Sequence, residues 1–279
     1  MRIVFIVLMA YATIGFVSTG KISAAVNDSL FVKGDSAQIG LTPKTNTSFA
    51  LNRINFDDSL QTIYNQIGLA EYDLSYEIFR YAMTGYYAMK QEGKLNDRNL
   101  LTIIDFTKSS NQRRFYTIDL DKNALKFFTY TSHGKNTGDV RAAQFSNRVN
   151  SNQSSLGFYI TGETYIGSKG FSLKLDGQDG NYNDKMRERG VVIHSADYVS
   201  ESWIKRYGRL GRSFGCPALS KDLFREVIDV IKNKTLVFAY YNDQQYLNSS
   251  SHLNTESLFQ KWEGQQQMEA LLSIVQVIN

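Results

Sequence analysis

Short apolar runs, bounded by glycine and polar residues, recur through the middle of the chain. Residues 101–106 and 114–120 are rich in β-branched and aromatic side chains, a composition typical of β-strands. Strands are expected at 101–106, 114–120, 125–131, 157–161, 171–175, 191–194 and 235–241, the last of which should close the sheet. Many short strands at close spacing predict a mainly β fold with a β-sandwich or barrel-like core.

Helical spacing, with apolar residues three and four positions apart, flanks this strand-rich region. The expected apolar faces are Leu60, Ile63, Tyr64 and Ile67, between a cap at 57–59 and Gly68; Phe79, Ala82, Met83 and Tyr86, ending near Gly93; Phe224, Val227, Ile228 and Ile231, capped by Ser220; and Met268, Leu271, Leu272 and Val275, within 255–275. The first two predict an N-terminal helical pair packed on the strand domain. The C-terminal helix is expected to pack back on that domain; a membrane or partner contact is the alternative.

The first 25 residues have the pattern of a secretory signal peptide. Arg2 gives a positive start, 3–17 is uncharged and largely apolar, and 23–25 offers small residues for cleavage. This apolar run is shorter than the roughly 20 residues of a membrane span, although an uncleaved anchor is the alternative. The expected segments are 1–25 as signal peptide, 26–95 as extended lead-in and helical region, 96–242 as the strand domain, and 243–279 as polar linker and C-terminal helix.

Charge and metal-ligand content exclude several function classes. The net charge is +4, of which Arg2 and Lys21 lie in the first 25 residues, too little to indicate nucleic-acid binding. One cysteine and three scattered histidines give no metal-site spacing, so no metal and no other cofactor are expected. In an exported protein, a single cysteine indicates a reactive thiol or an intermolecular bridge.

That cysteine, Cys216, has a partner of complementary chemistry in His194. His194 ends an apolar, β-branched run and is therefore expected at the end of a buried strand. Cys216 follows Ser213, Phe214 and Gly215 in a small-residue turn, where glycine lets a substrate approach the backbone closely. A thiol acts as a nucleophile in its thiolate form, and a neighbouring imidazole can take its proton. These residues predict a cysteine acyl-transfer enzyme.

The residues around this pair resemble the murein L,D-transpeptidase catalytic-domain family (YkuD-like). Its pattern is a strand that ends in His and a small residue, followed by S-x-G-C, here His194-Ser195 and residues 213–216. A weaker likeness extends over 69–241, including 102–114, 131–134 and 155–159. The resemblance implies that 96–242 is an L,D-transpeptidase-like catalytic domain with a YkuD-like β-sandwich or barrel core and a few packed helices.

The resemblance also implies a reaction. Cys216 attacks a peptidoglycan stem peptide after meso-diaminopimelate or a similar L-centre and releases terminal D-Ala, with His194 as general base and then acid. The backbone carbonyl of Ser195 orients His194, and the backbone N–H groups of Phe214, Gly215 and Cys216 are oxyanion-hole candidates. The acyl group then passes to an amine of a second stem or to water. A transpeptidase, a carboxypeptidase or endopeptidase, and a non-catalytic wall-binding module therefore stay open.

The chain departs from the commoner family pattern at Ala218, where an Arg usually stands two residues after the cysteine. Such an Arg would help to hold a substrate carboxylate. Arg212, with Arg209 and Arg206 upstream, is the replacement candidate, and a solvated loop is the alternative. The departure matches a subgroup with G-R-S-x-G-C-P-A.

Three further residues complete the candidate substrate-binding set. Ser213 is also expected to hydrogen-bond within the turn, Tyr198 lines the cleft or the core, and His133 lines the cleft or is structural. His252, in the polar tail, is expected to be exposed. Peptidoglycan stem peptides are the expected partners, with carbapenem-type inhibitors as reactive analogues and a membrane only through an uncleaved signal. The implied substrate places the protein in the periplasm or cell envelope of a bacterium.

Overall fold

The structure is a computed structural model that describes residues 55–278. The predicted signal peptide (1–25) and the lead-in up to residue 54 lie outside the described residues. Of the helices between residues 55 and 278, none combines the length and the apolar character that a membrane span requires.

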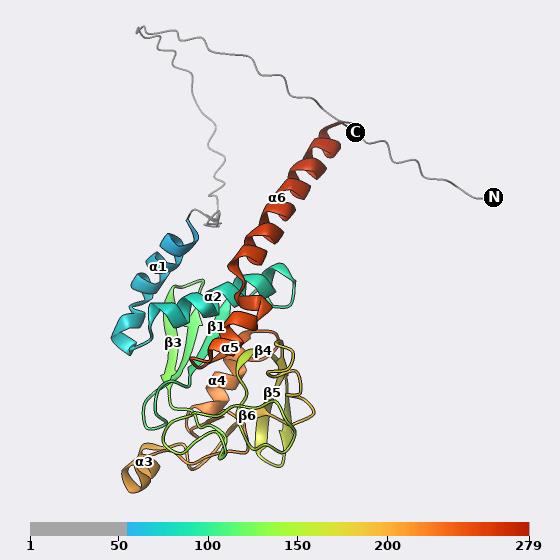
Figure 1. Ribbon diagram of the computed structural model, residues 1–279. Helices are drawn as coiled ribbons and strands as arrows, with labels where there is room; N and C mark the ends of the chain where they lie inside the picture. Colours follow the sequence, from blue (N-terminus) through green and yellow to red (C-terminus); the bar gives the residue numbers. More distant parts are fainter. Residues whose placement is uncertain (1–54, 279) are drawn as a thin grey trace, which may run out of the picture. The chain divides into compact units, whose positions relative to one another are not determined.

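One mixed sheet of eight strands forms the core of the described part of the chain (Figure 1). The strands are β1 (Leu100–Asp105), β2 (Phe115–Asp119), β3 (Ala124–Thr129), β4 (Gly157–Gly167), β5 (Gly170–Gly177), β6 (Val192–Ser195), β7 (Ala218–Leu219) and β8 (Leu236–Tyr240). Their order is β3-β2-β1-β8-β4-β5-β6-β7, with β1–β8 and β6–β7 parallel and the other pairs antiparallel. The sheet curls into a nearly closed barrel with about six helices around it, which confirms the predicted barrel-like β core with packed helices.

The last strand of the sequence lies in the middle of the sheet. β8 pairs with β1 on one side and with β4 on the other, so the prediction that it closes the sheet is wrong. All five of its residues are buried, which requires neighbours on both sides and helices or strands over both faces. Its apolar run predicted a strand correctly, but the order along the chain carried no information about its neighbours.

Helices surround this core at several places. They are α1 (Phe56–Ile67), the 3-10 turn η1 (Leu69–Tyr72), α2 (Tyr76–Gln91), α3 (Glu201–Tyr207), α4 (Phe224–Ile231), α5 (Gln244–Ser249), η2 (Ser251–Leu253) and α6 (Thr255–Ile278). The predicted N-terminal pair is α1 and α2, which contact β3, β1 and β8. α1 ends at Gly68 in the left-handed conformation that suits glycine, but it starts at Phe56, so the predicted cap residues lie within its first turn.

The helix after the cysteine loop is α4, which packs on β5 and β6. Its buried residues are Val227, Ile228 and Ile231, as the spacing predicted. The residue before the helix is Leu223, so the predicted cap at Ser220 is wrong. Ser220 instead accepts hydrogen bonds through its carbonyl from the N–H groups of Leu223 and Phe224, in a turn that precedes the helix. α4 thereby supports the strand that carries His194.

α6 contacts the rest of the described chain through its first turns. Leu258 and Phe259 are buried, and the Phe259 ring lies 5.3 Å from the ring of Phe56 in α1. Met268 and Leu272 are 58% and 55% exposed, so the prediction that this face packs on the domain is wrong for both. An α-helix rises 1.5 Å per residue, which places Met268 about 15 Å along the axis from Leu258.

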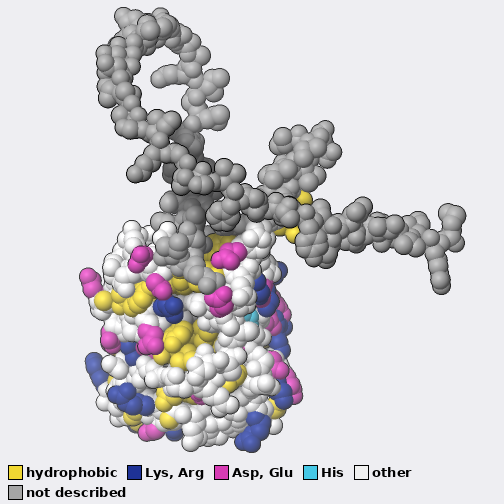
Figure 2. Space-filling model, turned by 45° about the horizontal axis from the view of Figure 1, so that its top comes forward, with side chains coloured by type: hydrophobic (Ala, Val, Ile, Leu, Met, Phe, Trp, Pro, Cys, Tyr) yellow, Lys and Arg dark blue, Asp and Glu magenta, His cyan; other side chains and the backbone are white. Residues whose placement is uncertain are grey.

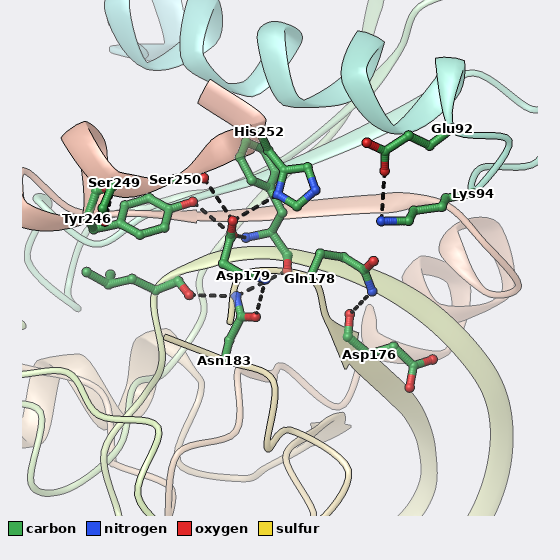
Figure 3. Close-up of polar contacts among 12 residues, drawn as sticks. Glu92, Lys94, Asp176, Gln178, Asp179, Asn183, Tyr246, Ser249, Ser250 and His252 are labelled. Atoms are coloured by element: carbon green, nitrogen blue, oxygen red, sulfur yellow. Dashed lines mark hydrogen bonds and ion pairs between the residues drawn. The ribbon is translucent and has the colours of Figure 1, made fainter. Parts of the chain in front are cut away.

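His252 is buried, which corrects the expectation that it is exposed. The carboxylate of Asp179 accepts hydrogen bonds from the Phe158 N–H (2.7 Å), the hydroxyls of Tyr246 (3.0 Å) and Ser250 (2.8 Å), and His252 Nδ1 (2.9 Å). Figure 3 shows these side chains converging on Asp179. A buried carboxylate needs such donors, so Ser250 and His252 belong to a buried network, whereas Asn248, Ser249 and Ser251 beside them are exposed.

Charged side chains of both signs are interspersed on the face shown in Figure 2. Within the described residues, ion pairs join many charged side chains, such as Arg187 with Glu163 (3.0 Å) and Lys261 with Glu92 (3.0 Å). Neither sign forms a continuous field on that face, which agrees with the small net charge.

Candidate active site

The pairing of β6 with β7 brings the cysteine turn to the strand that carries His194. His194 lies opposite Ala218 in this parallel pair, and Cys216 precedes Ala218 by two residues. The Cys216 sulfur lies 3.5 Å from the N–H of Val192 and 3.8 Å from the Gly190 carbonyl oxygen, both at the start of the same strand. The turn that holds Cys216 therefore lies beside the strand that carries His194, with the sulfur against the start of that strand.

Ser213 and Gly215 shape the turn in front of the nucleophile. The Ser213 hydroxyl accepts a hydrogen bond from the Gly215 N–H (3.0 Å) and donates one to the Cys216 carbonyl (2.7 Å). Gly215 has a φ of +125°, and a Cβ there would lie 2.7 Å from the Gln153 carbonyl oxygen. Only glycine fits both the conformation and the space. Ser213 is 6% exposed, so it organises the turn rather than offering its hydroxyl to a substrate.

The oxyanion-hole candidates differ in their availability. Because the Gly215 N–H is donated to Ser213, the prediction that it binds an oxyanion is not supported. The N–H groups of Phe214 and Cys216 have no hydrogen-bond partner within residues 55–278, and both precede the edge of β7. The structure therefore leaves two backbone donors next to the sulfur.

His194 is held in one tautomer by its own strand. Its Nδ1 lies 2.8 Å from the Ser195 carbonyl oxygen, the contact that the family resemblance implied. A carbonyl only accepts hydrogen bonds, so the proton resides on Nδ1 and Nε2 keeps its lone pair. This tautomer leaves Nε2 as the proton acceptor. The orienting group is a backbone carbonyl, and a carboxylate is not needed for this purpose.

Burial sets the ionisation of both groups. It raises the pKa of the Cys216 thiol, against the opposing effects of the Val192 N–H and of the charges of Lys169 and Arg189. Burial also lowers the pKa of His194. The resting site is therefore a neutral thiol and a neutral imidazole at physiological pH, whereas the sequence led us to expect an ionised sulfur.

Tyr198 is partly buried and packs against the apolar cluster of Ala196, Val199, Leu210 and Ala218, which favours its predicted role in the core. Its ring packs on Gly211, where an added Cβ would lie 2.3 Å from the Tyr198 Cβ. Burial, followed by the negative charge that Cys216 carries as a thiolate, raises the pKa of Tyr198 to about 12, and a hydrogen bond with Ser132 opposes this shift. Its hydroxyl therefore stays protonated near the sulfur.

His133 is structural, which corrects its assignment as a substrate-binding residue. It has no exposed surface; its Nδ1 accepts a hydrogen bond from Arg114 (2.8 Å), and its Nε2 lies 3.4 Å from the Gly138 carbonyl. Burial and then the charge of Arg114 lower its pKa to about 3, so it stays neutral. Its carbonyl accepts a hydrogen bond from the Ser213 N–H (2.9 Å), which links it to the cysteine turn.

Two of the three predicted cations upstream of the turn are already paired. Arg212 forms an ion pair with Asp139 (3.2 Å) and donates to the Gly138 carbonyl (3.1 Å). Arg209 pairs with the same carboxylate at 2.8 Å. These contacts favour the alternative that both residues stabilise the loop, and they weaken the assignment of Arg212 to a substrate carboxylate.

Arg189, which sequence reasoning missed, is one of two cations near the sulfur, with Lys169. An added Cβ at Gly215 would lie 3.3 Å from Arg189 Nη2, and the positive charge of Arg189 favours the thiolate form of Cys216. Arg189 ends a run of alternating charge at 185–189 that is typical of a solvated surface. Its only distinguishing mark was its place directly before the strand of His194.

The larger hollows found on the described surface lie elsewhere. One is lined by Arg148, Asp184 and Asp243, and another by Asp176, Arg187 and Lys234; neither includes Cys216 or His194. Within residues 55–278, no three His, Cys, Asp or Glu side chains gather closely enough to hold a metal ion. The candidate site therefore rests on its chemical groups rather than on cavity size.

Solved structures similar to this chain include L,D-transpeptidases and a cell-shape protein. An L,D-transpeptidase from Mycobacterium smegmatis is 14% identical, with 51% of this chain and 59% of that chain covered and a TM-score of 0.33. The L,D-transpeptidase LdtMt1 in complex with imipenem is 13% identical, with 51% and 59% covered and a TM-score of 0.32. The helical cell shape determining protein Pgp2 from Campylobacter jejuni is 14% identical, with 59% and 57% covered and a TM-score of 0.34.

This chain thus spans less than two thirds of the length of each of these proteins. A comparison with curated proteins found no match. The family model described as L,D-transpeptidase catalytic domain matches residues 70–240, a segment that holds the barrel, His194 and Cys216. Because this match covers more than half of the chain, the protein belongs to the L,D-transpeptidase catalytic domain family.

Proposed function

We propose that the protein is an exported L,D-transpeptidase that joins peptidoglycan stem peptides through a thioester on Cys216. Family membership supports the reaction class. One contact carries the proposal: the Cys216 sulfur lies 3.5 Å from the N–H of Val192, the first residue of β6. His194 follows Val192 two residues later in the same strand. The Nδ1 of His194 lies on the Ser195 carbonyl, so the turn that holds the nucleophile lies beside the strand that carries a correctly protonated base.

In the acylation step, His194 Nε2 accepts the thiol proton while the sulfur attacks the donor carbonyl carbon, on the C-terminal side of the L-centre of diaminopimelate. Negative charge develops on the carbonyl oxygen, where the N–H groups of Phe214 and Cys216 stabilise it. One such donor contributes about 3 kcal/mol to lowering the barrier. The imidazolium then protonates the nitrogen of the terminal D-Ala as the C–N bond breaks, and a thioester remains.

In the second step, an amine of another stem attacks the thioester. His194 takes a proton from that amine and returns it to the departing sulfur, so an amide forms and the thiol of Cys216 is regenerated. Water in place of the amine gives a carboxypeptidase or endopeptidase with the same residues. The neutral resting pair suits this cycle, since no charges are stored in a buried site before the substrate arrives.

The test uses purified protein and muropeptides with tetrapeptide stems, and the products are identified by mass spectrometry. Cross-linked dimers together with released D-Ala are the expected result. Trimmed monomers without dimers would instead assign the hydrolase. If folded wild-type protein yields neither dimers nor trimmed monomers, an enzymatic role is refuted and a wall-binding module is favoured. Cys216→Ala, which removes only the sulfur, is the control and should give no product.

Export and inhibition belong to the same proposal. The apolar run at 3–17 and the location of the substrate support a place in the bacterial periplasm or cell envelope. N-terminal sequencing of the protein recovered from the envelope of its host should find cleavage after 23–25. Recovery from the cytoplasm alone would contradict export. A carbapenem, whose strained lactam carbonyl acylates thiolates, should block the enzyme at Cys216.

A further inference from the structure

Arg189 lies in the turn before β6, and both Nη groups of its guanidinium donate hydrogen bonds to the loop 146–155. Nη1 donates to the Ser146 carbonyl (2.7 Å) and to the Ser155 hydroxyl. Nη2 donates to the Ser151 hydroxyl (3.3 Å) and to the Gln153 carbonyl. These four bonds use all four Nη hydrogens and fix both ends of the segment 146–155.

The guanidinium has an unusual environment for a half-buried charge. Within residues 55–278, no carboxylate lies at ion-pair distance from Arg189, whereas its neighbour Arg187 pairs with Glu163 and Asp176. Burial lowers the pKa of Arg189, and the negative charges that Tyr159 and Cys216 carry when deprotonated oppose this shift. A partly desolvated cation with neutral partners is costly, and such residues gather at functional sites.

The loop 146–155 packs directly against the cysteine turn. The Gln153 carbonyl that accepts from Arg189 lies 2.7 Å from the position of a Cβ on Gly215, and the Ser154 hydroxyl donates to the Gly215 carbonyl (3.3 Å). The same hydroxyl accepts a hydrogen bond from the Gly134 N–H (3.0 Å). Movement of the loop would therefore move the residue that precedes the nucleophile.

We infer that Arg189 is a positioning residue for Cys216: its guanidinium fixes the 146–155 loop against the cysteine turn and adds a positive charge near the sulfur. The inference rests on the proposed function for its catalytic meaning. Its Nη groups are fully occupied, so Arg189 acts through the loop and its charge rather than by binding a substrate carboxylate. It thus performs a different task from the Arg that the commoner family pattern places two residues after the cysteine.

Other groups also face the sulfur and must be held constant in a test. Lys169, in the turn between β4 and β5, lowers the pKa of Cys216, as Arg189 does. Tyr198 lies close enough to respond to the charge of Cys216. His194 comes from the adjacent strand. A substitution at Arg189 leaves all three in place.

The experiment measures the rate of alkylation of Cys216 by iodoacetamide as a function of pH. Cys216 is the only cysteine, so the rate reports that thiol alone. Arg189→Gln should raise the apparent pKa of alkylation by about one unit, which makes alkylation about tenfold slower at a fixed pH below that pKa. Arg189→Lys keeps the charge and should alkylate within about threefold of wild type, while its muropeptide turnover falls at least about tenfold because the fork of hydrogen bonds is lost.

Arg187→Gln is the matched control. It removes a positive charge only two residues from Arg189, and that charge belongs to an exposed ion pair. It should leave the alkylation profile unchanged. An unchanged pH profile of alkylation in Arg189→Gln would overturn the inference. Equal shifts of the apparent alkylation pKa in Arg189→Gln and Arg189→Lys would also overturn it, because they would indicate loss of packing alone. Should Arg189→Gln fail to fold, Arg189→Lys decides: a raised alkylation pKa or wild-type turnover would overturn the inference. Alkylation needs no peptidoglycan, so failure of the proposed function and failure of this inference are read separately.

Discussion

A methyl group added at Gly215 should damage both the fold and the reaction, for reasons that its surroundings define. Its φ is +125°, and a Cβ there would lie 2.7 Å from the Gln153 carbonyl oxygen and 3.3 Å from Arg189 Nη2. The first contact is with backbone, which cannot rotate aside as a flexible side chain can. Gly215→Ala therefore forces either the cysteine turn or the 146–155 loop to move.

Two costs add in this variant. A non-glycine residue held at such a φ costs on the order of 1–3 kcal/mol, and overpacking against the loop costs roughly another 1–3 kcal/mol. For a domain of this size, 1 kcal/mol corresponds to roughly 2–4 °C, so we expect the Tm to fall by about 5–20 °C. A shift of about 1 Å at the adjacent sulfur can cost about 100-fold in rate, so turnover should fall by about that factor.

Thermal unfolding followed by circular dichroism and the muropeptide assay measure these two effects. Gly208→Ala is the control, since Gly208 has a φ of +73° and nothing lies within 4 Å of its added Cβ. It bears the conformational cost alone and should keep turnover within about threefold of wild type, as distant surface changes do. A Gly215→Ala protein with wild-type turnover would refute the account of the turn.

Four further predictions follow from individual contacts. His194→Ala should lower kcat/KM by at least about 100-fold, as expected for a general base; a loss of less than about tenfold would place the base elsewhere. Because burial lowers the pKa of His194 and raises that of Cys216, the neutral pair persists between these values. Activity should therefore decline on the acid side only below about pH 6.5, the ordinary imidazole value, and an acid limb above it would contradict the lowered pKa of His194. Ser213→Ala removes one acceptor and one donor from the cysteine turn and should cost about 1–3 kcal/mol of stability, with kcat reduced more than KM is changed; an unchanged kcat would contradict this role. Asp179→Asn removes the buried carboxylate that four donors share and should lower stability by about 2–4 kcal/mol in thermal unfolding, while turnover per folded molecule stays the same; a variant with normal Tm and impaired turnover would contradict it.

The sequence was sufficient for the central pair because each residue had a local reason to be noticed. His194 ends an apolar strand, and Cys216 follows a small-residue turn in a chain with no other cysteine. Their meeting requires only that the chain return beside β6, which it does through β7. Seven of the eight strands were likewise predictable from apolar runs. β7, which has only two residues, and α3, which has no buried residues and hence no apolar face, were not predicted.

The errors concern residues whose roles depend on distant partners. His252 lies in a polar stretch, and only the buried carboxylate of Asp179 explains its burial. Arg212 lies near the cysteine in sequence but pairs with Asp139. Arg189 lies in a charged run that resembles surface, and its value comes from the loop 146–155, more than thirty residues upstream. No local pattern contains such information.

The most direct test of the central claim is the intact mass of the protein after exposure to imipenem, followed by peptide mapping. The account predicts one adduct with the mass of the opened lactam, located on Cys216, formed by the wild type and absent from Cys216→Ala. His194→Ala should form it at least about 100-fold more slowly. A folded wild-type protein that stays unmodified, or an adduct on any other residue, would contradict Cys216 as the acylated nucleophile.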